Sequence, residues 1–211
     1  MKLTVLGATG GIGRQIVSQA LDAGHQVTAV VRDPARLVLS HPALEVLTAD
    51  VTDPQALRPA VAGRDAVLSA LGPRSRKAAG IASLGTRSAV QALEETGGRR
   101  IVVVSAVPVG PMPEGESLLY RSVLNPLLCA VLREAYADLA AMEAELSRSA
   151  ADWTVVRPPK LTNRPRTGHY RTALGANVPH GRSISRADVA HLMLATLDDP
   201  ATVRQAVGVA Y

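Results

Sequence analysis

The glycine-rich segment at residues 7–13 constrains the fold of this chain more than any other feature. It reads Gly7-Ala8-Thr9-Gly10-Gly11-Ile12-Gly13 and joins an apolar run at residues 3–6 to a segment with helical spacing at residues 12–23. At this spacing Gly7 lets the chain turn sharply off a strand, Gly10 lets backbone approach a ligand, and Gly13 lets helix and sheet pack closely. The segment therefore predicts a strand, a tight turn and a helix whose free N–H groups and dipole favour a diphosphate.

A plain turn without a ligand is the alternative interpretation of this segment. A turn alone needs one glycine, however, and not three at this spacing. We therefore expect a dinucleotide cofactor to be bound here by Gly7, Thr9, Gly10, Gly11, Ile12 and Gly13.

Short apolar runs alternate with helical segments along the rest of the chain. They predict strands at residues 27–31, 44–47, 66–71, 101–104 and 153–156, and helices at residues 81–95 and 133–149. Strands that are apolar on both faces are typical of a parallel sheet covered by helices on both sides. We expect an α/β fold with a doubly wound, mostly parallel sheet. A length of 211 residues favours a single domain over residues 1–211, with a small C-terminal lobe on the substrate side.

The composition narrows the expected partners. Aromatic residues make up 2% of the chain, which disfavours a protein that stacks nucleic-acid bases. The net charge of +5 comes from arginines scattered between Arg14 and Arg204, a pattern that favours a small anionic molecule over a polyanion. The single cysteine, Cys129, excludes an internal disulfide and a cysteine zinc site, and it suits a reducing cytoplasm. We expect no metal, no nucleic acid, no targeting segment and no membrane span, and a monomer or a homodimer.

The end of the second predicted strand indicates which dinucleotide binds. NAD-selective sites usually place an acid there for the ribose hydroxyls, whereas this chain has Arg32, with Arg36 one helical turn later. Because a guanidinium pairs bidentately with a 2′-phosphate, we expect NADP(H), with NAD(H) as the alternative. Asp33 could act as the ribose acid, but Asp33-Pro34 also has the pattern of a helix start. Asp50 and Val51, after the third strand, could flank the adenine, or Asp50 could be a turn acid.

These motifs together resemble the atypical short-chain dehydrogenase/reductases of the NAD(P)-binding Rossmann superfamily, and most of all the NmrA-like and biliverdin-IXβ (flavin) reductase-like group. The similarity covers nearly the whole chain. It is carried by the glycine segment, by Val31-Arg32-Asp33, and by later motifs at residues 63–67, 71–72, 104–106, 153–159, 168–170 and 184–190.

The resemblance implies a Rossmann fold and a role for each matching position. Arg32 and Arg36 would bind the 2′-phosphate, and Asp50 and Val51 would border the adenine. Ser105, after the fifth strand, would lie near the nicotinamide and is a candidate catalytic residue. Lys160 is the second candidate, although the flavin reductase pattern has a histidine there. The remaining implied cofactor contacts are Leu71, Gly72, Pro159 and Leu161.

The catalytic pair of ordinary short-chain dehydrogenases, Tyr-x-x-x-Lys, is missing from this chain. Tyr136 is followed four residues later by Ala140, and Tyr120 by Leu124. Without the lysine a tyrosine keeps a pKa near 10 and is poorly matched to proton transfer at neutral pH. Alcohol dehydrogenation and sugar epimerisation are therefore disfavoured. Glu143 and Glu145 are expected on a solvated helix face.

The missing acid pair leaves two functions open. A planar conjugated acceptor such as a flavin, quinone or bilin delocalises the charge left by hydride transfer, so solvent can protonate it afterwards. The first hypothesis is thus an NADPH-dependent reductase of such an acceptor. The alternative is an NmrA-like, non-catalytic NADP(H) sensor. Residues 108–135, which hold several prolines and glycines, are expected to form a lid or an interface.

Overall fold

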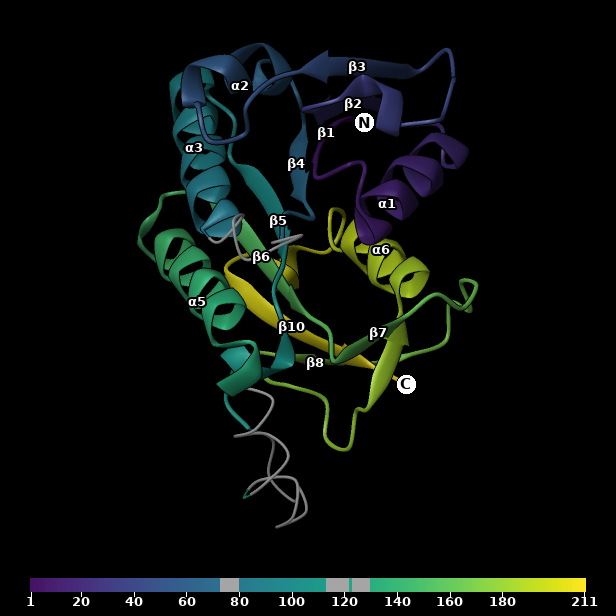
Figure 1. Ribbon diagram of the computed structural model, residues 1–211, viewed down its shortest axis with the longest axis vertical. Helices are drawn as coiled ribbons and strands as arrows, with labels where there is room; N and C mark the ends of the chain where they lie inside the picture. Colours follow the sequence, from purple (N-terminus) through teal and green to yellow (C-terminus); the bar gives the residue numbers. More distant parts are fainter. Residues whose placement is uncertain (73–79, 113–121, 123–129) are drawn as a thin grey trace.

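The structure is a computed structural model that describes residues 1–72, 80–112, 122 and 130–211. An eight-stranded sheet lies between two layers of helices (Figure 1). The strands are β1 Lys2–Leu6, β2 Gln26–Val31, β3 Leu44–Thr48, β4 Ala66–Ser69, β5 Arg100–Val104, β6 Asp152–Arg157, β7 Lys160–Thr162, β8 Arg171–Leu174, β9 Ser183–Ser185 and β10 Gln205–Ala210. The helices are α1 Gly11–Asp22, α2 Pro54–Val61, α3 Ile81–Thr96, α5 Arg133–Arg148 and α6 Arg186–Ala195, and the 3-10 turns are η1 Pro34–Arg36, η3 Val107–Val109 and η5 Pro200–Thr202.

The sheet has the strand order β3-β2-β1-β4-β5-β6-β10-β8, and all neighbours are parallel except β10 and β8. The first six positions follow the order of a Rossmann sheet, in which the strand order reverses between β1 and β4. β7 and β9 form a separate parallel pair. The predicted doubly wound, mostly parallel fold is confirmed.

Two apolar cores lie on opposite faces of the sheet, because its strands are apolar on both sides. One core packs α1 and α6 against the sheet, and Ile16 and Met193 are among its fully buried residues. The other packs α2, α3 and α5 against the opposite face, with Leu57, Leu93 and Leu146. Neither core contains phenylalanine, so aliphatic side chains and alanine fill both layers.

The turn after β1 depends on two glycines that touch. A Cβ on Gly13 would stand 2.1 Å from the carbonyl oxygen of Gly7, which is far inside van der Waals contact. A Cβ on Gly7 would stand 2.7 Å from the carbonyl oxygen of Ala70, and Gly7 has φ +75°, a conformation that favours glycine. The first turn of α1 is therefore held directly against the carboxyl ends of β1 and β4.

The C-terminal part of the chain is organised around the buried carboxylate of Asp188. This carboxylate, in the first turn of α6, accepts hydrogen bonds from the N–H groups of Thr167 and Gly168 and from the hydroxyls of Thr167, Ser185 and Tyr211. Burial raises the pKa of Asp188, but the hydrogen bonds, led by that of Tyr211, outweigh burial and lower it to about 2. One charged group thus ties the segment before β8, the start of α6 and the chain end together.

Sequence patterns missed several elements in the second half of the chain. No helix was predicted for α6, and no strand for β7, β8, β9 or β10. α2 was also missed; it contains Pro59, and Asp53 caps it by accepting from the N–H of Gln55 at 2.9 Å. The predicted lid or interface at residues 108–135 falls mainly on residues 113–121 and 123–129, outside the described part of the chain.

One expectation about a helix surface is wrong. Glu143 does not lie on a solvated face of α5, because its carboxylate pairs with Arg157 at the end of β6. Their side chains are only 15% and 11% exposed. The charged residues along α5 suggested a solvent-exposed face, but Arg157, from a strand that follows the helix in sequence, pairs with this glutamate and covers it.

We predict that Asp188→Asn lowers the free energy of unfolding by roughly 2 kcal/mol at pH 7, because the native pKa lies about two units below its usual value. A lowered native pKa stabilises the fold above the unfolded-state pKa, and that contribution is lost as the pH falls from about 4 toward about 2. Urea unfolding at several pH values measures this. Asp198→Asn, at an exposed position, is the control. A constant difference between wild type and Asp188→Asn across that pH range contradicts the prediction.

Candidate dinucleotide site

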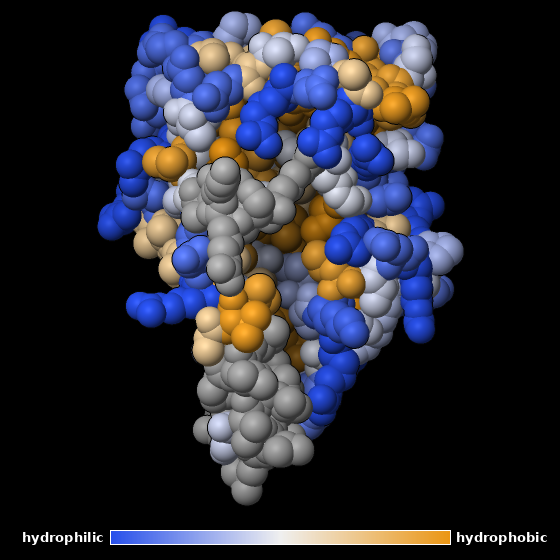
Figure 2. All heavy atoms as spheres, viewed as in Figure 1, coloured by the Kyte–Doolittle hydropathy of each residue, from blue (hydrophilic) through white to orange (hydrophobic). Residues whose placement is uncertain are grey.

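A cavity of about 680 Å³ opens at the carboxyl ends of β1 and β4, where the strand order reverses. Open α/β sheets bind ligands at this position. Figure 2 shows the molecule hollowed here, with apolar side chains deep in the hollow and hydrophilic ones around it. The cavity is lined by Gly7, Thr9, Gly10, Gly11, Ile12, Val30, Val31, Arg32, Asp33, Arg36, Val51, Ala70, Leu71, Gly72, Ile81, Leu161 and Arg186.

The glycine turn supplies the floor of the cavity at the start of α1. The N-cap residue of this helix is Gly10, and no side chain caps the helix. The first turn of α1 also contains no acidic residue. Its N–H groups and the positive end of its dipole therefore face the cavity without a negative side chain of their own, which is the environment that binds phosphate. Gly13 does not line the cavity, and its role is the close packing against Gly7.

Two arginines mark one end of the cavity, after β2. Arg32 and Arg36 both line it, and between them Asp33 accepts a hydrogen bond from the N–H of Ala35 at 3.1 Å. Asp33 therefore caps the 3-10 turn η1, in agreement with its pattern as a helix start, and it also lines the cavity. Arg14 on α1 donates to the carbonyl oxygen of Arg36 at 2.9 Å, which ties η1 to the glycine-turn helix.

Asp50 and Val51 lie after β3 but have different surroundings. Val51 is buried and lines the cavity. Asp50 does not line it, and its carboxylate accepts from the N–H and the hydroxyl of Thr52 at 2.9 and 2.8 Å. These two hydrogen bonds, together with the charge of Arg32, hold the pKa of Asp50 below its usual range. These hydrogen bonds are those of a turn acid, which was the alternative to a position beside the adenine.

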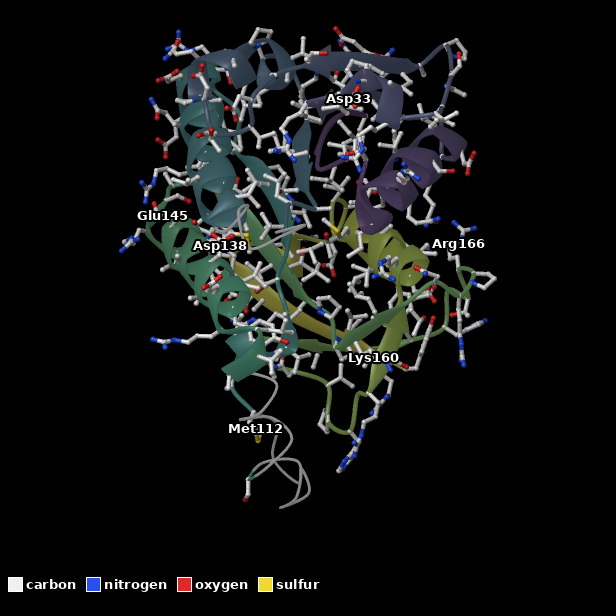
Figure 3. All side chains as sticks on the ribbon, in the orientation of Figure 1. Asp33, Met112, Asp138, Glu145, Lys160 and Arg166 are labelled. Atoms are coloured by element: carbon white, nitrogen blue, oxygen red, sulfur yellow. The ribbon has the colours of Figure 1, made fainter. Side chains whose placement is uncertain are left out.

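The other end of the cavity is formed by residues after β4 and in β7. Leu71, Gly72 and Leu161 line it, as the resemblance implied. Pro159 and Lys160 do not line it, and Lys160 is exposed at the start of β7 (Figure 3). Leu161 therefore forms part of the cavity lining, whereas the candidate catalytic residue Lys160 lies outside it.

Ser105 follows β5 and is 5% exposed. Its N–H donates to the carbonyl oxygen of Val156 at 2.8 Å, which continues the pairing of β5 with β6. Its hydroxyl has no hydrogen-bond partner among the described residues. A buried hydroxyl without a partner is costly, and a bound ligand is one way to satisfy it. Ser105 does not line the cavity itself.

Arg186 is a site residue that sequence reasoning did not single out. It lines the cavity from the first position of α6, far from the glycine turn in sequence. A Cβ on Gly11 would stand 2.6 Å from its Cδ and 2.8 Å from its Nε, so its side chain lies over that glycine. The motif containing Arg186 was noted for its resemblance, but nothing in its spacing connects it to residue 11.

A tyrosine acid does not face the cavity in the described chain. Tyr170 packs against the α1 and α6 core, and its hydroxyl lies 2.7 Å from Nδ1 of His191. Burial and the charge of Asp188 raise the pKa of Tyr170 to about 12, which makes it a poor proton donor at neutral pH. Within residues 1–72, 80–112 and 130–211 there is no cluster of metal-ligating side chains and no helix long and apolar enough to cross a membrane.

Comparisons with known proteins agree with this geometry. Residues 7–200 match the family model described as NAD(P)H-binding. The chain is 32% identical to an uncharacterized chloroplastic protein of Arabidopsis thaliana over 93% of its own length and 71% of that protein. It is 29% identical to the uncharacterized sugar epimerase YhfK of Bacillus subtilis, over 98% of this chain and 92% of that protein.

A solved structure confirms the architecture. ChuY, an anaerobilin reductase from Escherichia coli O157:H7, superposes with a TM-score of 0.79 at 21% identity, covering 100% of this chain and 97% of that one. At this identity the likeness concerns the fold. The family model matches most of the chain, and the sheet order and the cavity at the strand reversal agree with it. The chain therefore belongs to the NAD(P)H-binding family of Rossmann-fold proteins, as the resemblance of its motifs predicted.

Proposed function

We propose that this protein is an NADPH-dependent reductase that transfers a hydride to a planar conjugated acceptor of the flavin, quinone or bilin type. The observation that carries the proposal is the charge of the cavity: the described residues of its lining include Arg32, Arg36 and Arg186 and one carboxylate, Asp33. NADPH carries a diphosphate and a 2′-phosphate, so it suits a cavity with a helix N-terminus in the middle and arginines at its edges.

The preference for NADPH rests on Arg32 and Arg36. They follow β2, at the place of the ribose partner in Rossmann sites. The carboxylate between them, Asp33, already accepts a backbone hydrogen bond, which leaves it less free to bind the ribose hydroxyls. Two guanidinium groups match the charge and the planar geometry of a phosphate, and Arg14 holds the backbone of Arg36 in place.

We predict that Arg32→Gln weakens NADPH binding by about 10- to 100-fold and changes NADH binding by less than about threefold, because the lost charge-assisted hydrogen bonds involve the 2′-phosphate alone. Calorimetric titration with both cofactors measures the effect. Arg148→Gln, at a position whose side chain is 70% exposed on α5, is the control for loss of a positive charge. An equal loss of affinity for both cofactors would contradict the assignment of Arg32 to the 2′-phosphate.

The choice of acceptor follows from the missing proton donor. A ketone would need a positioned acid, but the Tyr-x-x-x-Lys pair is absent from the sequence and Tyr170 is hydrogen-bonded to His191. A conjugated acceptor takes a hydride from the reduced nicotinamide and then a proton from water, so one NADPH becomes NADP⁺ for each two-electron reduction. The anaerobilin reductase ChuY, a neighbour in fold, supports an acceptor of this kind.

We predict that the purified protein oxidises NADPH only when an acceptor is present, with FMN, a quinone and biliverdin offered separately and NADPH absorbance followed. Ser105→Ala is expected to lower kcat about tenfold with the affinity for NADPH retained, because we propose that its buried, unpartnered hydroxyl orients the reacting groups and does not bind phosphate.

The same assay tests the alternative of a non-catalytic sensor. A sensor binds NADP⁺ and NADPH with different affinities and shows no acceptor-dependent oxidation. The absence of the acid pair is the observation that favours it. No turnover with any of the three acceptors, in a protein that binds NADPH, rejects the reductase and supports the sensor.

A further inference from the structure

We propose that Arg186 binds the diphosphate of the cofactor from the side opposite the glycine turn and closes the phosphate site over α1. This inference rests on the proposed binding of NADPH and adds to it a residue from the far end of the chain. It concerns which side chain neutralises the diphosphate, since residues 7–13 of the glycine turn include no charged side chain.

Arg186 lies over the start of α1. Its Cδ and Nε lie within 3 Å of the point where a Cβ of Gly11 would stand, so its side chain covers the first residue of α1. It lines the same cavity as Thr9, Gly10 and Gly11. A diphosphate bound at the start of α1 would therefore lie next to the side chain of Arg186.

The charge of Arg186 is unfavourably placed in the protein without a ligand. Arg186 stands at the positive end of α1 and is also the first residue of α6, so its charge is placed where helix dipoles disfavour a cation. The acid in the first turn of α6, Asp188, is already engaged by Thr167, Gly168 and Tyr211. In the described part of the chain Arg186 makes no ion pair. A dianionic ligand between Arg186 and α1 would reverse the sign of this interaction.

The side chain of Arg186 is held in place by an uncharged partner. Nη1 of Arg186 donates to the side-chain oxygen of Asn163 at 2.7 Å. Asn163 is uncharged, so it orients the guanidinium and leaves its positive charge available. Ser185 caps α6 by accepting from the N–H of Asp188, which fixes the helix start that carries Arg186. α6 packs along α1, so the helices that carry Gly11 and Arg186 belong to one packed layer (Figure 1).

The proposal predicts opposite effects of two variants on two fragments of the cofactor. ADP-ribose contains the diphosphate without a 2′-phosphate, and 2′-AMP contains the 2′-phosphate without a diphosphate. Arg186→Gln is expected to weaken NADPH and ADP-ribose by about 10- to 100-fold and to change 2′-AMP by less than about twofold. Arg32→Gln is expected to weaken NADPH and 2′-AMP and to spare ADP-ribose. Titrations followed by NMR reach the weak affinities of the fragments.

The controls separate the charge of Arg186 from its shape and from the fold. Arg186→Lys keeps the charge without the planar fork and is expected to fall between wild type and Arg186→Gln. Arg164→Gln removes an equal charge from an exposed position outside the cavity and is expected to change none of the affinities. Without ligand, Arg186→Gln is expected to keep or raise Tm, since it removes a cation from two helix N-termini.

These titrations distinguish a failure of the role of Arg186 from a failure of NADPH binding itself. If wild type binds NADPH and Arg186→Gln binds ADP-ribose as tightly as wild type does, this inference is wrong and the proposed function stands. If Arg186→Gln lowers the Tm of the ligand-free protein and weakens both fragments equally, Arg186 is a structural residue and the inference is again wrong. If wild type fails to bind NADPH, the proposed function itself fails, and the inference with it.

Discussion

The contact between Gly13 and the carbonyl group of Gly7 determines the rest of the site. Because no side chain separates them, the first turn of α1 lies directly on the turn that leaves β1. The same turn presses Gly7 against the backbone of Ala70 after β4. Three pieces of backbone therefore meet where the strand order reverses, and the start of α1 is held at the sheet edge. The cavity, its arginines and the predicted cofactor all depend on this contact.

The charges around that contact are unbalanced in the protein alone. Arginines come from three separate segments, after β2, in η1 and at the start of α6, whereas the described cavity lining contributes one carboxylate. Other charged groups have close partners, as in the pair of Arg157 with Glu143 and the hydrogen-bonded Asp188. Among the described residues, the cavity lining therefore gathers more cations than anions. Since like charges oppose folding, the protein keeps this arrangement at a cost in stability that a bound anion would offset.

The sequence was sufficient for the parts of the structure that depend on local contacts. The glycine turn, β1 to β6, α1, α3 and α5 were predicted because each has a strong apolar pattern or a turn residue beside it. α2 was missed because Pro59 interrupts its pattern, and β7 and β9 because three residues carry no detectable alternation. Most of the cavity lining was predicted. Arg186 was not, because its role arises from the packing of α6 on α1, which no local pattern encodes.

The site divides into two halves that differ in how they are built. The half proposed to bind phosphate is formed by backbone N–H groups and by arginines; Arg14 holds the backbone of Arg36, and Asn163 orients Arg186. The half near Leu71, Gly72 and Leu161 is apolar, and the buried hydroxyl of Ser105 follows the neighbouring strand β5. In the proposed complex, charge would fix the cofactor, while the far half offers shape and little acid–base chemistry. A reaction carried out there has to be one whose product charge is stabilised by the substrate itself, and this requirement, more than any single residue, favours a conjugated acceptor.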